Sequence, residues 1–191
     1  MTRWRGLAMA ALVTGCSSLP ITRIYVLGDP PAPAIGVRSE AGLVVIVLRT
    51  VSVPDYLDTT DILRRSGPNE VIPSPTGRWG ERLSLGLTDA LASALSGRLP
   101  QLVITTIPAA EPTRRLFVDV DRADIGIDGS CLVAARWRVT GIDGKTMAAS
   151  SHGTFGETAA SSDDSAVASA MTKVIGRLAE QVAATIEAGG R

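Results

Sequence analysis

Two kinds of side chain in this sequence could do chemistry, thiols and carboxylates. The sequence has two cysteines, and Cys16 follows a short apolar run and two small residues, Thr14 and Gly15. Asp119 and Asp121 share one face of a predicted strand, with Asp124 nearby. Paired carboxylates can act as general acid and base or hold a cation. Apolar residues alternate with them, however, so we favour a simpler interpretation in which this face of the strand lies in water.

Other chemistry has little support. A structural zinc site needs four cysteine or histidine ligands, whereas the chain after Cys16 offers His152 and Cys131. His152 falls in a polar stretch and is expected to be solvated. The sequence has neither the G-x-S-x-G elbow of a serine hydrolase nor a glycine-rich phosphate loop. We therefore expect no metal, no cofactor and no enzyme activity.

The N-terminal segment determines where the protein works. Arg3 and Arg5 precede an apolar run over residues 6–13, which is far shorter than the roughly 20 residues of a transmembrane helix. This pattern is typical of a secretory signal. Residues 13–16, Val-Thr-Gly-Cys, resemble the lipobox of bacterial lipoproteins. That resemblance implies a diacylglyceryl thioether on Cys16, cleavage before it, and N-acylation of the new terminus.

These modifications would divide the chain into three parts. Residues 1–15 would be a lipoprotein signal peptide, residues 16–23 a lipidated tether, and residues 24–188 a single domain. Two or more acyl chains, at about 0.8 kcal/mol per buried CH₂, hold such a domain stably on a bilayer. The protein is therefore expected to be anchored to a membrane and not to span it.

Composition excludes several partners and roles. The 19 basic and 19 acidic residues balance, and aromatic residues make up only 4% of the chain. Without a basic face or stacking platforms, nucleic acid is not an expected partner. If Cys16 carries lipid, Cys131 has no disulfide partner. Cys131 shares an apolar strand face, so we expect a small core residue and not a reactive thiol.

Hydrophobic patterning predicts the elements of the first half. Strands are expected over residues 24–27, 43–53 and 102–107, and a hairpin over 62–72 around the turn at 66–69. The pairs Arg64-Arg65 and Arg114-Arg115 are expected in turns. An apolar stripe predicts a long helix over 76–99, capped by Ser74 or Thr76. Trp79 extends this stripe and is expected in the core.

The second half is predicted from turn chemistry. The Asp-Gly pairs at 128–129 and 143–144 suit type I′ turns and separate three strands, over 116–127, 130–142 and 145–155. A second amphipathic helix is expected to begin near the polar run 161–164 and to end at about Ile186. The expected fold class is α+β, a mixed, mostly antiparallel sheet with two amphipathic helices packed on it.

Several segments, taken in order, resemble the ABC-type transport auxiliary lipoprotein family. None of them is a catalytic motif, so their order and spacing carry the resemblance. The matching segments are the lipobox at Cys16 and residues 25–27, 51–58, 62–65 and 78–83.

The resemblance implies a non-enzymatic accessory lipoprotein of the cell envelope that faces the periplasm. Its partners would be a tunnel protein of the MCE (mammalian cell entry) type and the ABC transporter that moves lipid through it. Family members are similar to docking components and are implied to assemble as homo-oligomers. Ser17 follows Cys16 where an inner-membrane retention signal would place aspartate, which favours the outer membrane.

The sequence is compatible with more than one set of partner contacts and more than one function. Tyr56 and Leu57 follow Pro54 in a predicted loop, and both are candidate partner contacts; for Tyr56, packing over the sheet edge is an equal alternative. Two other functions are considered: a lipoprotein that binds a small hydrophobic ligand, and an assembly factor for another outer-membrane machine. An envelope hydrolase that uses Asp119 and Asp121 is the least supported.

Overall fold

The larger of two sheets forms the body of the molecule. The computed structural model describes residues 21–28, 44–108 and 113–189, so Cys16 and the lipobox-like segment lie outside the described residues. This sheet has five strands in the order β5-β2-β6-β7-β8. Strand β2 runs parallel to both β5 and β6, and the other pairs are antiparallel. Its strands are β2 (Val45–Leu48), β5 (Val103–Thr105), β6 (Arg114–Ile125), β7 (Ser130–Gly141) and β8 (Met147–Thr158).

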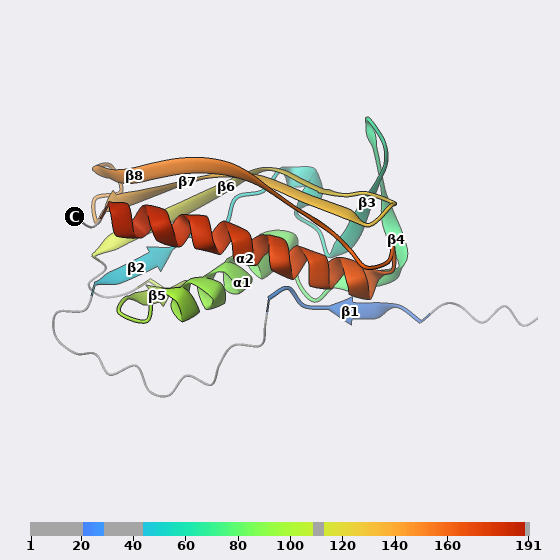
Figure 1. The fold of residues 1–191 in the computed structure, drawn as a ribbon, viewed down its shortest axis with the longest axis horizontal. Helices are drawn as coiled ribbons and strands as arrows, with labels where there is room; N and C mark the ends of the chain where they lie inside the picture. The colour runs from blue at the N-terminus through green and yellow to red at the C-terminus, as the bar shows by residue number, and fades with distance from the viewer. Residues whose placement is uncertain (1–20, 29–43, 109–112, 190–191) are drawn as a thin grey trace, which may run out of the picture.

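Two helices cover one face of this sheet. Helix α2 (Asp164–Ala188) runs along the sheet, and α1 (Leu83–Arg98) lies beside it (Figure 1). The predicted apolar row of α2 is buried against β7 and β8. The Asp163 side chain caps α2 by accepting a hydrogen bond from the Ala166 N–H at 2.9 Å. The expected α+β class, with a mostly antiparallel arrangement and two helices, is confirmed.

The β6–β7–β8 meander is confirmed, but its turns are not of type I′. Gly129 and Gly144 have φ of 84° and 69°, whereas type I′ also requires a positive φ at the residue before each glycine. Asp128 and Asp143 keep negative φ, and the Asp128 carboxylate accepts from the Ser130 N–H at 3.0 Å. Each loop is therefore a tight turn that ends in one left-handed glycine.

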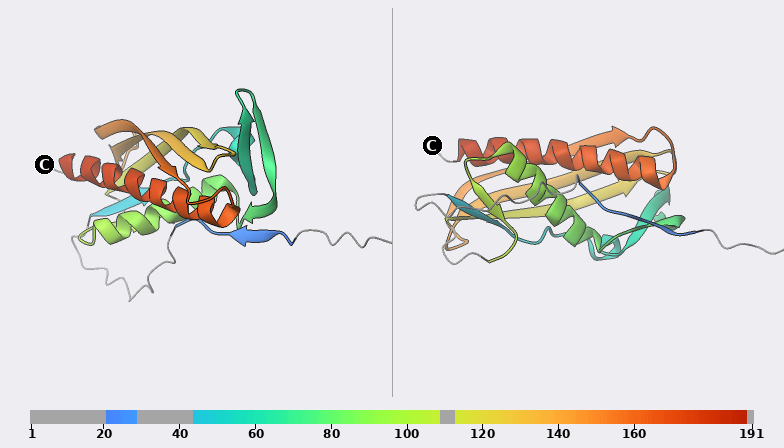
Figure 2. Two further views of the ribbon diagram at one scale, coloured as in Figure 1. Left: turned by 45° about the vertical axis from the view of Figure 1, so that its right-hand side comes forward. Right: turned by 90° about the horizontal axis from the view of Figure 1, so that it is seen from below.

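A smaller sheet stands at one end of the molecule. It has the order β1-β4-β3, with β1 (Arg23–Tyr25) parallel to β4 (Glu70–Trp79) and β3 (Asp61–Gly67) antiparallel to β4. The β3–β4 hairpin, predicted from the turn at 66–69, projects beyond the larger sheet (Figure 2). The strands of the protein thus divide between two sheets, whereas the sequence predicted one.

The prediction of a helix over 76–99 is wrong at its N-terminal end. Residues 76–79 continue β4, and α1 begins at Leu83. The strand continues because Gly77 and Trp79 pair with Arg23 and Tyr25 of β1, and the Trp79 N–H donates to the Thr60 carbonyl at 2.7 Å. Trp79 is buried, as predicted, but at the end of a strand and not on a helical stripe.

The core lies between the helices and the inner face of the larger sheet. Cys131 belongs to the buried row of β7, as its alternation with apolar residues predicted. Burial raises the pKa of the Cys131 thiol to about 11, so the thiol stays protonated and unreactive near neutral pH. Among the described residues no helix combines the length and apolar character that crossing a bilayer requires.

Candidate partner-binding surface

The outer face of the five-stranded sheet pairs the predicted carboxylates with arginines. Asp119 contacts Arg138 at 3.2 Å, and Asp121 contacts Arg136 at 2.7 Å. The Arg138 guanidinium also lies 4.4 Å from the centre of the Phe117 ring. These ion pairs are partly or largely exposed to water. This arrangement agrees with a solvated sheet face, on which each of the two carboxylates is paired with an arginine.

Asp124, the third of the predicted carboxylates, is buried between the two sheets. Its carboxylate accepts from the Arg65 Nε at 2.7 Å and contacts Arg122. Arg65 lies in β3, not in a turn as predicted, so this ion pair joins the smaller sheet to β6 of the larger one. Arg114 and Arg115 likewise belong to a strand, at the start of β6.

A buried ion pair also links the smaller sheet to α2. The Arg64 Nη2 donates to Asp164 Oδ1 at 2.7 Å and to the Ser162 carbonyl at 2.9 Å. The hydroxyls of Ser74 and Thr76 both donate to Asp164 Oδ2, each at 2.7 Å. Arg64 and Asp164 are both largely hidden from solvent. We call these four residues the Asp164 cluster.

The electrostatics of the Asp164 cluster favour the charged carboxylate. Burial raises the pKa of Asp164, but the hydrogen bonds from Arg64, Ser74 and Thr76 outweigh it and hold the pKa below its ordinary value. Position 77 of β4, next to Asp164, must also lack a side chain, because a Cβ on Gly77 would lie 2.5 Å from Asp164 Oδ2. The Asp164 cluster therefore joins the smaller sheet to α2.

Local sequence signals do not by themselves indicate the Asp164 cluster. Ser74 and Thr76 were predicted to cap a helix, and the acidic pair before α2 was predicted only to mark the start of that helix. The cap is in fact supplied by Asp163 alone, which leaves Asp164 free for its partners on β3 and β4. An available signal was that two consecutive aspartates begin one helix, because a single cap uses one of them.

Tyr56 lies on a short rigid loop after β2. Residues Asp55–Leu57 form one 3₁₀ turn, in which the Leu57 N–H donates to the Pro54 carbonyl at 2.8 Å. Consecutive residues of this turn point in different directions. The side chain of Tyr56 is therefore 51% exposed, while Leu57 is only 5% exposed and packs in the core. Tyr56 therefore remains a candidate contact, whereas the burial of Leu57 does not favour a contact made by its side chain.

The loop is fixed to the start of α1 by Asp58. Its Oδ1 accepts from the Ser84 N–H at 3.1 Å, and its Oδ2 lies 3.4 Å from the Arg82 guanidinium. Hydrogen bonding from Ser84, assisted by Arg82, lowers the pKa of Asp58. Because the N-cap residue Arg82 supplies no side-chain cap of its own, Asp58 satisfies a free N–H of the helix from a distance. A fixed backbone therefore presents Tyr56 to solvent.

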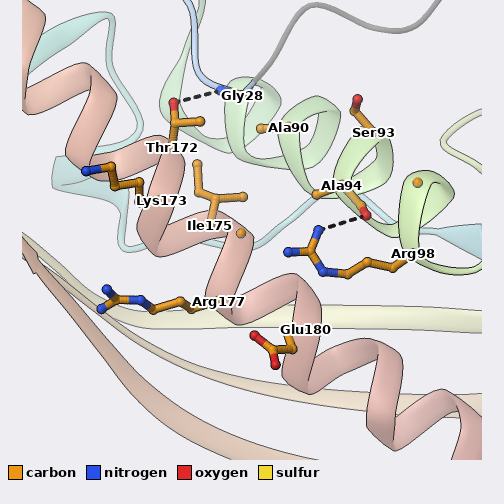
Figure 3. A pocket seen from close by; sticks show the side chains of 12 residues that line it. Gly28, Ala90, Ser93, Ala94, Arg98, Thr172, Lys173, Ile175, Arg177 and Glu180 are labelled. Atoms are coloured by element: carbon orange, nitrogen blue, oxygen red, sulfur yellow. Dashed lines mark hydrogen bonds between the residues drawn. The ribbon is translucent and has the colours of Figure 1, made fainter.

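The surface also has open hollows. The groove between α1 and α2, of about 580 Å³, is lined by small residues such as Ala90, Ala94 and Gly176. Arg98 reaches toward it from α1, while Lys173, Arg177 and Glu180 come from α2 (Figure 3). A shallow depression of about 830 Å³ lies at the β6–β7 turn. Neither is the closed apolar cavity that a small hydrophobic ligand would need.

His152 is exposed on β8, in register with Arg136. Within residues 21–28, 44–108 and 113–189, no group of three or more histidine, cysteine, aspartate or glutamate side chains could hold a metal ion. Among the large hydrophobic residues that are exposed in the described ranges, Tyr56 is the aromatic one, and aromatic side chains are enriched at protein interfaces.

The sequence of this chain is similar to a known protein family and to named members of it. The family model described as "ABC-type transport auxiliary lipoprotein component" matches residues 25–183. The intermembrane transport lipoprotein PqiC of Escherichia coli (strain K12) is 27% identical over 72% of this chain and 73% of its own length. PqiC of Shigella flexneri matches to the same extent.

Solved structures agree at the level of the fold. A crystal structure of a protein from Xanthomonas campestris superposes with a TM-score of 0.66 at 18% identity, covering 90% of this chain and 94% of that one. The structure of an uncharacterised protein superposes with a TM-score of 0.71 at 17% identity, covering 87% and 99%. The family match, which covers residues 25–183, shows that the chain belongs to the ABC-type transport auxiliary lipoprotein components.

Proposed function

We propose that this protein is a lipid-anchored, periplasm-facing docking component of an ABC transporter system that moves lipid through an MCE-type tunnel protein. The family match over residues 25–183 carries this proposal. The relatedness to PqiC, an intermembrane transport lipoprotein, supports transport between membranes. The protein's own contribution is positional: it holds a folded surface at a fixed place for another protein to contact.

The anchor in this proposal is Cys16, which would carry diacylglyceryl and N-acyl chains. Arg23, the first residue of β1, is the seventh residue after Cys16. At about 3.3–3.6 Å each, these residues reach at most roughly 25 Å. The domain would therefore remain close to the membrane surface, in our proposal the periplasmic face of the outer membrane.

Tyr56 is the contact that we assign to the tunnel protein. Tyrosine is enriched at the energetic centres of interfaces because one side chain offers a large apolar ring and a hydroxyl. The loop that carries it is already fixed through Asp58 and Ser84. Binding would therefore cost little additional ordering of the backbone.

Photocrosslinking in living cells tests this assignment. A photoreactive amino acid at position 56 is expected to capture the MCE-type protein, which mass spectrometry of the crosslinked band would identify. Ile142 is the matched control, since it is 55% exposed against 51% for Tyr56 but lies in the β7–β8 turn. Capture from position 142 and not from 56 would contradict the role of Tyr56. Capture of no transport protein from either position would contradict the docking function.

A further inference from the structure

The outer side of β1 exposes aliphatic side chains that the fold does not cover. Ile24 is 71% exposed and Val26 is 70% exposed, and both point away from the core that Leu27 enters. Ile21, just before the strand, is 85% exposed. Single exposed aliphatic residues are common on proteins, but neighbouring ones form a patch that favours contact with another apolar phase.

The patch continues into a small apolar hollow. Gly80 lies beside it, because a Cβ at Gly80 would be 3.3 Å from Val26 Cγ2 and 3.5 Å from Ile24 Cγ2. The hollow next to Val26 measures about 160 Å³. Glu81 is its one charged lining residue, and the rest of the lining is apolar or glycine: Tyr25, Leu27, Trp79, Gly80, Leu83 and Gly86. We call Ile24, Val26, Gly80 and this hollow the β1 face. The β1 face thus has protruding aliphatic side chains next to a small hollow.

The direction of the chain indicates what covers the β1 face. β1 is the first described strand, and its first residue, Arg23, is the seventh residue after Cys16 in the sequence. The face therefore lies within the roughly 25 Å reach of the proposed lipid anchor. Arg23, also exposed at this end of the strand, can face anionic headgroups. Acyl chains on Cys16 would therefore keep a bilayer within reach of the β1 face.

We propose that the β1 face lies in the interfacial region of the phospholipid membrane that holds Cys16, so that the domain is oriented on the membrane and not only tethered to it. This inference rests on the lipid anchor of the proposed function. It adds a second membrane contact, made by the folded domain. In this orientation Ile24 and Val26 contact the outer ends of acyl chains, while Arg23 remains at the level of the headgroups.

Depth-dependent quenching of tryptophan fluorescence tests the orientation. The full-length acylated protein is reconstituted in vesicles of phosphatidylglycerol and phosphatidylethanolamine, with bromine on the acyl chains of the latter. Ile24→Trp and Val26→Trp place the reporter in the β1 face, and Ile142→Trp places it on an exposed turn at the far end of the larger sheet. Signal from the native tryptophans is subtracted with the unsubstituted protein.

We expect quenching at positions 24 and 26 to exceed that at 142 several-fold. Mass spectrometry of the N-terminal peptide records acylation in each preparation. If the chains are acylated and positions 24, 26 and 142 are quenched alike, the membrane orientation is wrong while the anchor stands. A chain without acyl groups would overturn both the anchor and this inference. If a second copy or another protein covers position 24, quenching there will not exceed that at position 142. This result would also contradict the proposed membrane contact.

Discussion

Cys16→Ala is expected to abolish the stable attachment to the membrane that the acyl chains provide. The thioether requires a thiol, so the variant can receive no diacylglyceryl group and is expected to remain an unprocessed or soluble precursor. Each acyl CH₂ contributes about 0.8 kcal/mol of membrane affinity, and losing two or more chains removes stable anchoring. Metabolic labelling with a clickable fatty acid, followed by detergent phase partition, measures both the modification and the attachment.

Cys131→Ala is the matched control for this experiment. It makes the same side-chain change, but at a buried thiol whose raised pKa keeps it unreactive. This variant is expected to incorporate the fatty acid as the unaltered protein does. Equal labelling of the Cys16→Ala variant would contradict the anchor and, with it, the membrane-held role that we propose.

The second half of the fold could be predicted because its signals are local. Strict alternation along β7, glycines in the two tight turns, and a capping run before α2 each specify structure within a few residues of themselves. Even so, the turn type was predicted wrongly. Aspartate forms side-chain bonds to the following N–H groups and so keeps a negative φ, which a dipeptide pattern does not show.

The start of α1 could not be predicted from local signals. Ser74 and Thr76 are good capping residues, but their hydroxyls donate to Asp164, which lies 90 and 88 residues further along the chain. Pairing of β4 with β1 then extends the strand to Trp79. Tertiary contacts of this kind override local helix signals. The same holds for Arg64 and Arg65, whose partners lie on α2 and β6.

Tyr56 and Leu57, which the sequence assigned to one loop surface, differ in exposure. An aromatic residue after a proline that ends a strand indicated a surface loop, and Tyr56 is exposed there. The neighbouring Leu57 enters the core because the 3₁₀ turn points successive side chains in different directions. Sequence neighbours in such a turn cannot both be assigned to one surface. The exposed apolar face of β1 gave no local signal, since exposed and buried strands share the same residue types.

Asp164→Asn is expected to lower the free energy of unfolding by about 3–5 kcal/mol, because it leaves Arg64 charged and buried without a counter-ion. The loss also weakens the hydrogen bonds from Ser74 and Thr76. Asp121→Asn is the matched control: its ion pair with Arg136 has the same length of 2.7 Å but is exposed. That change should cost no more than about 1 kcal/mol. Urea unfolding of the acyl-free domain, followed by circular dichroism, measures both.

The same comparison made over a range of pH tests the charge on Asp164. Its pKa is lowered in the folded protein, so its contribution is fully present above the ordinary aspartate pKa of about 3.9. It is lost as the pH falls through the folded value. The stability difference between the unaltered protein and Asp164→Asn should therefore be constant near neutral pH and shrink as the pH falls below about 4. Two results would contradict the role of the charged Asp164 cluster in joining the smaller sheet to α2. The first is a stability difference that stays unchanged in acid. The second is an Asp164→Asn effect at neutral pH that is no larger than that of Asp121→Asn.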